Sequence, residues 1–544
     1  MPQTSLRKEN MSVSSQLKSR ATQYRPSGAS ASEISRLVKL AAAWFARLEP
    51  ALRNIKSDAF ILTKDQRLEL ALAMTEMADD LHADSGIWRA LESSNLALFR
   101  TPLPGLREPT DPPPTRLDAR RFHFFLDGVW RHFQPDAIVS PRHLGFAAIA
   151  ADASDFFSTH LGASPPEPSS VSTFLDSDHS RAWDVKRKLV WLGTRSFLLR
   201  FAHADYVTRE AAQRREPPTI ALTDDFLSQE CTAWSGLGAL ELLAERLGLF
   251  AKDRAELLGW HARHIAFYRI DTIAENNDVL MTMGLKNLVN EQPYLVRVEM
   301  PRARLPFQIG NMVFGGLVPW RGEWYWSGTQ QRWPEVPGDF PNIKREFFHR
   351  SALITYRYCP DRAAKARTYS AEQHDAFVRF HGTDLAVFPD GLTMAAAEQR
   401  RTRHYNQSRA AELDARYADL DHVKNGPSLP YPPEIIDCTR GVGLFSQPGE
   451  SIEIFREFDV LCAALRASET PLSEDQSASL QGFIESPAIS PAFVRRVIAR
   501  HGSAGLSSLY HLPPGDSVAL DHLLRRHKGA YYRPRPPDIT LVDD

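Results

Sequence analysis

Apolar residues recur at helical spacing near the start of the chain. From Ile34 to Ile55 they follow one another at steps of three or four residues, which places them on one face of a helix. Thr63–Gln66 has the form of a capping box and precedes a second apolar stripe, from Leu70 to Leu81. The prolines between Pro102 and Pro114 then remove backbone donors and interrupt the helical pattern. The pattern predicts an N-terminal helical unit over residues 33–100.

Residues 1–32 have a different composition, rich in Ser and in cations and poor in apolar side chains. The cations are Arg7, Lys8, Lys18, Arg20 and Arg25, and the acid is Glu9. The small apolar surface of this segment cannot offset the conformational entropy that the chain would lose on folding. We therefore expect residues 1–32 to form a disordered basic tail. The same composition is also typical of an organelle transit peptide.

Helical periodicity resumes after the prolines and predicts a helical domain over residues 118–293. Its clearest helix runs from Leu237 to Leu247, where Gly248 can adopt the left-handed conformation that ends a helix. After Pro293 the period becomes that of strands, in Tyr294–Met300 and Asp384–Phe388, so we expect an α+β domain over residues 294–424.

Gly and Pro dominate residues 425–433, and four helical stripes joined by short links follow. This pattern predicts a C-terminal helical unit over residues 434–544. The expected fold is therefore mainly α and multidomain, with one α+β region that contains an aromatic β-hairpin.

Composition limits the class of protein. The 544 residues have a formal net charge of -1 and are 43% hydrophobic, which is ordinary for a soluble globular protein and argues against coating of nucleic acid by the whole surface. The four cysteines form no C-x-x-C pair, which favours a reducing, cytoplasmic location. No run of eighteen apolar residues exists, so we expect no membrane span.

The segment Phe314–Gly328 holds the densest group of aromatic residues in the chain. Trp320, Trp324 and Trp326 surround a turn at Arg321 and Gly322, which predicts a β-hairpin. Because side chains alternate along a strand, Trp324 and Trp326 should share one face, and we expect that face to be core. Trp320 and the exposed Arg321 are the candidates in this hairpin for contact with a partner.

A basic segment near the C-terminus is a second candidate contact surface. It interleaves two tyrosines, Tyr531 and Tyr532, with the cations Arg525, Arg526, Lys528, Arg533 and Arg535. Such a mixture can hold phosphates and stack on bases. Solvated helix ends and ordinary aromatic packing explain the same residues without a ligand.

Three acidic or histidine motifs could hold a metal. His381, Asp384 and Asp390 flank a short strand, as the ligands of Mg²⁺ do in many nucleases, although Pro389–Gly391 is also a turn signature. His261 and His264 fall three residues apart, on one face of a predicted helix.

Asp224 and Asp225 form the third motif and are expected in a first helical turn, where the helix dipole stabilises negative charge. They could instead join a metal cluster with Asp271, Glu275 and Asp278. Capping is the simpler interpretation.

Two functions from different classes follow. The first is a non-catalytic cytoplasmic interaction protein without a cofactor, which contacts a protein or nucleic-acid partner through the hairpin and the basic segment. The second is a metal-dependent hydrolase or nuclease in which Mg²⁺ is held near His381, Asp384 and Asp390. We favour the first, because each acidic motif has an adequate structural explanation. The oligomeric state stays open.

Overall fold

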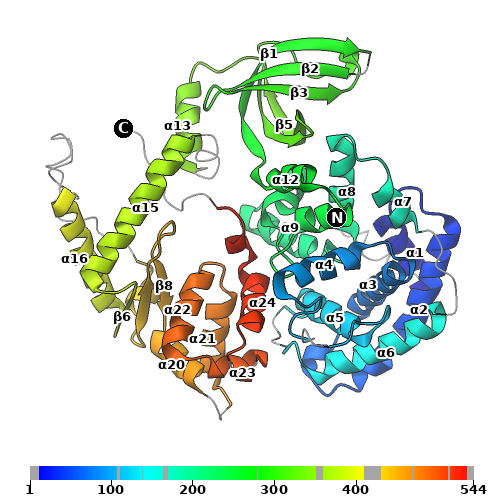
Figure 1. Ribbon diagram of the computed structural model, residues 1–544, viewed down its shortest axis with the longest axis horizontal. Coiled ribbons are helices and arrows are strands. Elements are labelled where there is room, and N and C mark those ends of the chain that lie inside the picture. The colour runs from blue at the N-terminus through cyan, green and yellow to red at the C-terminus, as the bar shows by residue number, and fades with distance from the viewer. Residues whose placement is uncertain are drawn as a thin grey trace. The chain divides into compact units, whose positions relative to one another are not determined.

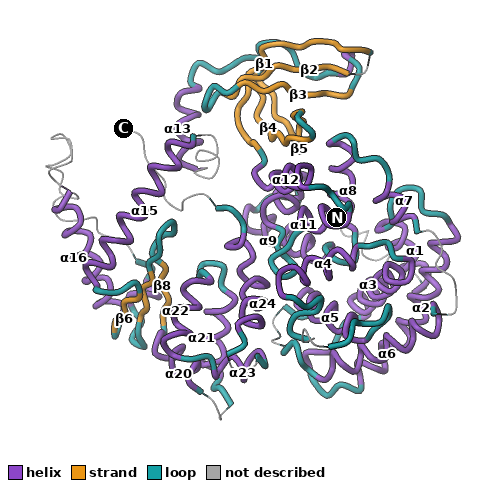
Figure 2. Tube along the Cα trace, in the orientation of Figure 1, coloured by secondary structure: helices purple, strands orange, loops and turns teal. Residues whose placement is uncertain are grey.

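A computed structural model describes residues 12–106, 111–135, 137, 139–162, 169–278, 280–350, 359–409, 431–467, 471–512 and 515–535. The chain forms two compact units, residues 1–336 and 337–544 (Figure 1). Both contain helices and a small β-sheet, so the fold is mainly α with α+β parts, as the sequence predicts (Figure 2). No helix in the described part of the chain is long and apolar enough to cross a membrane.

The first unit begins with a helical body that shares one hydrophobic core. Its α-helices are α1 (Val13–Tyr24), α2 (Ala31–Arg53), α3 (Lys64–Ala83), α4 (Ile87–Phe99), α5 (Ala119–Phe133), α6 (Leu144–Leu161), α7 (Ser170–Asp176), α8 (Ala182–Arg195), α9 (Arg200–Arg214), α10 (Ile220–Asp225), α11 (Ala239–Arg246) and α12 (Ala251–Gly259). The core joins residues of α2 and α3 to residues of α5, α6, α8 and α11. The segments predicted as separate helical units at 33–100 and 118–293 are therefore packed into one body.

The predicted disordered tail is wrong for the segment after residue 11. Ser12 accepts a hydrogen bond from the backbone N–H of Ser15 and begins α1. Leu17 and Ala21 of this helix are fully buried. Two apolar side chains one turn apart are enough to seat a short helix on a larger body, although composition alone indicates disorder. Residues 1–11 lie outside the described part.

A closed five-stranded barrel follows the helices in the first unit. Its strands are β1 (His264–Asn277), β2 (Leu280–Asn287), β3 (Pro293–Glu299), β4 (Met312–Trp320) and β5 (Glu323–Trp333), in the order β1-β2-β3-β5-β4. All neighbours are antiparallel except β3 and β5. In β2, Met281, Met283 and Leu285 are buried and alternate with half-buried residues, which is the pattern of a strand with one face in a core. The sheet begins inside the predicted helical domain, earlier than the expected boundary at residue 294.

The aromatic hairpin is confirmed as β4 and β5. Trp320 pairs with Glu323 across a two-residue turn in which Arg321 and Gly322 both have positive φ, of 52° and 86°. Positive φ at both central residues is the geometry that matches the twist of a hairpin. Tyr325 is buried and packs with the helical core, whereas Trp324 and Trp326, on the face expected to be core, are only half-buried. The ring of Trp324 lies 4.9 Å from that of Tyr294 of β3.

The second unit combines helices with a three-stranded antiparallel sheet in the order β6-β7-β8. Its elements are α13 (Phe340–Arg350), α15 (Pro360–His381), β6 (Leu385–Phe388), α16 (Gly391–Arg409), α19 (Pro433–Ile436), β7 (Val442–Phe445), β8 (Glu453–Arg456), α20 (Phe458–Arg466), α21 (Glu474–Glu485), α22 (Pro491–His501), α23 (Ala504–Tyr510) and α24 (Ser517–Lys528). The predicted C-terminal helices are confirmed, but they share a core with Leu385 and Phe445 of the sheet. Residues 425–430 of the predicted break lie outside the described part of the chain, and segments on either side of it share this core.

We expect Trp324→Ala to lower the free energy of unfolding by about 2 kcal/mol, because the half-buried ring of Trp324 would lose its aromatic contacts. Its ring lies 4.7 Å from His264 as well as 4.9 Å from Tyr294. Chemical denaturation followed by circular dichroism measures the change. Trp183→Ala is the matched control, since Trp183 is 64% exposed, and it should cost less than about 1 kcal/mol. Equal stability of the Trp324→Ala and wild-type proteins would show that this face is not core.

Candidate functional site: a groove above a buried ionic network

The last two turns of α3 carry three buried carboxylates in the centre of the helical body. Glu76, Asp79 and Asp80 are 6%, 1% and 5% exposed. Burying a charge is costly unless it is paired and hydrogen-bonded, so each of these carboxylates requires a partner. The sequence analysis did not identify them. The signal available was a run of acids, Glu76-x-x-Asp79-Asp80, inside an otherwise apolar helix.

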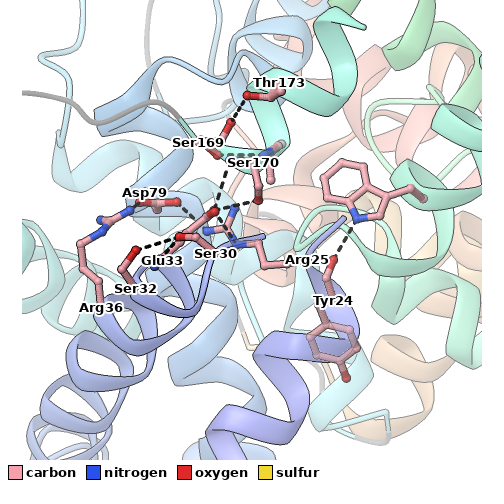
Figure 3. Close-up of polar contacts among 12 residues, drawn as sticks. Tyr24, Arg25, Ser30, Ser32, Glu33, Arg36, Asp79, Ser169, Ser170 and Thr173 are labelled. Carbon is pink, nitrogen blue, oxygen red and sulfur yellow. Dashed lines mark hydrogen bonds and ion pairs between the residues drawn. The ribbon is translucent and has the colours of Figure 1, made fainter. Parts of the chain in front are cut away.

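Asp79 is shared by two arginines from different segments (Figure 3). Arg25, which follows α1, donates to one carboxylate oxygen at 2.5 Å, and Arg36 of α2 donates to the other at 2.8 Å. Burial acts to raise the pKa of Asp79, but Arg25 and Arg36 outweigh burial and hold the pKa below its usual value. Arg25 also lies 3.7 Å from Glu33, whose carboxylate accepts a hydrogen bond from the Ser170 hydroxyl at 2.8 Å.

Glu76 is paired with Arg200 at the start of α9. The Arg200 guanidinium lies 4.1 Å from the ring centre of Tyr24, a cation–π contact. The Tyr24 hydroxyl donates to Glu69 at 3.1 Å, and burial together with Glu69 raises the pKa of Tyr24 to about 12. Cations from α2, from α9 and from the end of α1 therefore neutralise acids of the single helix α3.

Asp80 has a different role, as the cap of the next helix. Its two oxygens accept hydrogen bonds from the backbone N–H groups of Ile87 and Trp88 at 3.1 and 2.9 Å. Gly86 precedes them with a φ of 89°, which favours glycine. Burial raises the pKa of Asp80 to about 6.

A groove of about 540 Å³ opens above this network, between α2 and the ends of α3 and α6. On α2 the groove is lined by Ser32 and by Ser35, Arg36 and Lys39, which follow Ser32 by three, four and seven residues. This spacing places the four side chains on one helical face. The opposite wall adds His82 and His160. The acid in the lining is Asp79, which already pairs with Arg25 and Arg36. Hydroxyl-bearing and cationic side chains therefore outnumber acids in the walls of the groove.

The structure gives each of the three predicted magnesium ligands a separate partner. The His381 ring nitrogen lies 3.0 Å from Glu398, which also pairs with Arg401. Asp384 forms an ion pair with Arg496, and Asp390 caps α16 by accepting from the Thr393 N–H at 2.7 Å.

The other predicted metal motifs differ from the expected geometry. Asp224 and Asp225 lie in the last turn of α10, not the first, and pair with Lys186 and Arg263. The Lys186 ammonium also donates to the Ser327 hydroxyl at 3.2 Å, which ties α8 to β5.

His261 belongs to a 3₁₀ turn and His264 begins β1, so the two histidines do not share a helical face. Within the described residues, no group of three or more His, Cys, Asp or Glu side chains is arranged to hold a metal ion.

The cations of the predicted C-terminal contact surface have contacts inside the second unit. Lys528 and Arg533 are 2% and 8% exposed, and the Lys528 ammonium donates to the Ser486 carbonyl at 2.6 Å. Arg525 pairs with Asp521 at 2.9 Å, and Arg535 pairs with Glu450 at 3.1 Å. Arg526 is half-buried on the same helix. These contacts reduce the free positive charge of the segment.

The predicted contact residues of the hairpin also have internal contacts. Trp320 is fully buried and its indole N–H donates to the carbonyls of His179 and Ser180. It therefore does not lie on the surface of the first unit, because it fills the junction between the barrel and the helical body. Arg321 is exposed, as expected, and pairs with Asp253 of α12 at 2.7 Å.

No family model, curated protein or solved structure matches this chain. The geometry of the groove is therefore the basis for a functional assignment.

We expect Asp79→Asn to lower the free energy of unfolding by about 3 kcal/mol or more, because two arginines, of which Arg25 is buried, would share a neutral partner. The pKa of Asp79 is depressed, so its contribution to stability is present above the unfolded-state value of about 3.9 and is lost as the pH falls through the folded-state value. Denaturation at pH 7 and pH 3 should therefore show a smaller difference between variant and wild type at pH 3. Asp84→Asn, which removes an exposed ion pair with Arg89, should cost less than about 1 kcal/mol.

Lys528 leads to a second pH prediction. Burial lowers its pKa to about 7, against the opposing effects of Glu453 and Glu485. The unfolded chain then binds more protons than the folded chain between pH 7 and pH 10, so this group makes stability rise with pH. Lys528→Met should reduce that rise, whereas Lys365→Met, at an exposed position of α15, should leave it unchanged. An identical pH dependence for Lys528→Met and wild type would contradict the assignment.

Proposed function

We propose that this protein is a non-catalytic, cytoplasmic interaction protein that binds a phosphate-bearing partner in the groove formed by α2, α3 and α6. The proposal keeps the class expected from the sequence, including a nucleic acid as one source of phosphate, but moves the contact to another surface. The four cysteines, all in the described part of the chain, form no disulfide with one another, which agrees with a reducing compartment.

The observation that carries the proposal is the chemistry of the groove wall. Its volume of about 540 Å³ falls in the range of small-molecule sites, roughly 300–1,000 Å³. Arg36 and Lys39 provide positive charge, and Ser32 and Ser35 provide hydroxyl donors on the same helical face. Phosphate oxygens accept hydrogen bonds from these groups.

Arg36 is held in place before a ligand arrives. Its contact with the buried Asp79 fixes one end of the guanidinium, and Asp79 is fixed by Arg25 behind it. A side chain that is already ordered loses less entropy on binding. Lys39, by contrast, is exposed and can adjust to the ligand.

The positive wall is short, which favours a compact phosphate group over a long polyanion. Two turns further along α2, Arg47 pairs with Asp152 of α6, so the cations do not continue as an open track. We therefore expect a terminal phosphate, from a nucleotide or from the 5′ end of an oligonucleotide, to bind more tightly than an internal stretch of backbone.

The test is a binding titration with fluorescent nucleoside triphosphate and with one single-stranded oligonucleotide, prepared with and without a 5′-phosphate, at low salt. Lys39→Glu should weaken binding about tenfold or more, because charge reversal replaces attraction by repulsion. Lys252→Glu, at an exposed position of α12, is the matched control and should bind like wild type. A weak dependence on salt is expected, since few phosphate charges are neutralised.

The possible outcomes separate the ligand sources. Tighter binding of the 5′-phosphorylated oligonucleotide than of nucleotide supports a nucleic-acid end, and the reverse supports a small molecule. Equal affinity with and without the 5′-phosphate, a steep salt dependence, or equal effects of Lys39→Glu and Lys252→Glu would each refute binding in this groove.

A further inference from the structure

The groove between α2, α3 and α6 changes in chemistry along α2. Arg36 and Lys39 line its polar end, and the lining continues with the apolar side chains of Leu40 and Ala43. Ala43 follows Arg36 by seven residues, which at 1.5 Å per residue is about 10 Å along the helix. The groove therefore offers cations at one end and an apolar surface at the other.

The end of α6 forms the wall opposite this apolar surface. The two helices are antiparallel, because Arg47 of α2 pairs with Asp152, whereas Trp44, nearer the start of α2, contacts Phe156, nearer the end of α6. One further turn in the same directions reaches His160, which also lines the groove. His160 is therefore level with the apolar end of the groove.

The His160 ring is a flat surface that is held in place before a ligand arrives. Its Nδ1 lies 2.8 Å from the Phe156 carbonyl oxygen, and because a carbonyl only accepts, Nδ1 carries a proton and donates it. The ring also packs against the buried ring of Phe156, with ring centres 4.2 Å apart. His160 itself is exposed. A ring ordered in this way loses little entropy when another flat ring stacks on it.

A ligand that contacts both ends of the groove must carry a phosphate and a flat ring, joined by a short linker. A nucleoside 5′-phosphate has this composition, because its sugar separates the base from the phosphate. Its base stacks on aromatic side chains through a face that every base has. Sugar phosphates and inorganic phosphates lack such a ring and would contact the polar end alone.

We propose that the groove binds a nucleoside 5′-phosphate, whose base stacks on the His160 ring while its phosphate binds Arg36 and Lys39. This rests on the phosphate binding proposed for the groove and adds the part of the ligand next to the phosphate. His160 distinguishes nucleotides from other compact phosphates, and the identity of the base has a small effect because stacking tolerates all bases. A free nucleotide and the 5′ end of a nucleic acid share this chemistry.

Calorimetric titration of the full chain compares ATP with inorganic tripolyphosphate, which has three phosphates but no base. We expect ATP to bind about tenfold more tightly, the order that stacking on one aromatic side chain contributes. His160→Ala should remove most of that difference, and His160→Phe, which keeps a flat ring, should retain it. His404→Ala is the matched control, since His404 is also an exposed helical histidine beside a phenylalanine, Phe380, and it should bind both ligands like wild type.

The outcomes separate the nucleotide from phosphate binding itself. If Lys39→Glu weakens tripolyphosphate binding but ATP binds no more tightly than tripolyphosphate, the phosphate site stands and the stacking is overturned. Equal losses of affinity for both ligands in His160→Ala would also overturn it, because stacking acts on the base alone. Binding of neither ligand would refute the phosphate site and the nucleotide with it. If circular dichroism shows that His160→Ala does not fold, His160→Leu is measured with the same expectations.

The 5′-phosphorylated oligonucleotide distinguishes the two sources of the nucleotide. If it binds more tightly than ATP and loses affinity in His160→Ala, the ligand is the end of a nucleic acid. The opposite order of affinities, with the loss in His160→Ala confined to ATP, identifies a free nucleotide. Both results support stacking on His160, whereas unchanged affinity of His160→Ala for both ligands would refute it.

Discussion

The helical body of the first unit depends on neutralising the charges that α3 carries into its core. A helix that buries Glu76 and Asp79 can pack only where cations reach it, and these cations come from the segment after α1, from α2 and from α9. The desolvation cost of ion pairs in a protein interior is large, so such pairs are weak evidence for stability. Their effect here is on arrangement: segments far apart in the sequence must meet at α3 in one geometry, or a buried charge is left without a partner.

The same constraint shapes the surface above. Because Arg25 and Arg36 share Asp79, the acid that would otherwise make the groove negative is neutralised from both sides. Arg36 is then presented in a fixed position beside Lys39 and two serines. The ion pairs that neutralise Asp79 in the core thus also order the Arg36 guanidinium at the surface. One residue therefore serves both the packing of the core and the proposed binding.

Local sequence patterns predicted many individual helices, strands and turns correctly, but they did not predict how these elements pack together. The Thr63 capping box, the hairpin turn at Arg321 and Gly322, and the short strand before Phe388 all rest on contacts within a few residues, and the structure shows each of them. The barrel was missed because β1 looks irregular in sequence and its pairing with β4 joins residues far apart. The site was missed for the same reason: nothing near Asp79 in the sequence indicates that Arg25 and Arg36 lie against it. Other motifs wrongly suggested residues that could bind a metal or a partner. Asp384, Asp390 and Lys528 instead form ion pairs or hydrogen bonds with groups of their own unit.

The junction around Asp224 has a consequence for how the first unit unfolds. Asp224 receives Lys186 from α8, which also reaches Ser327 of β5, and a β-carbon at Gly328 would lie 2.1 Å from the Asp224 carboxylate. The Gly328 backbone therefore packs so closely against the Asp224 carboxylate that a side chain at position 328 would not fit. Trp320 and Tyr325 belong to the same hydrophobic core as the helices. Opening the barrel would expose part of the helical core and remove the Ser327 hydroxyl from the buried Lys186 ammonium at the same time, so barrel and helices should melt in one cooperative transition and exchange their slowest amide hydrogens together.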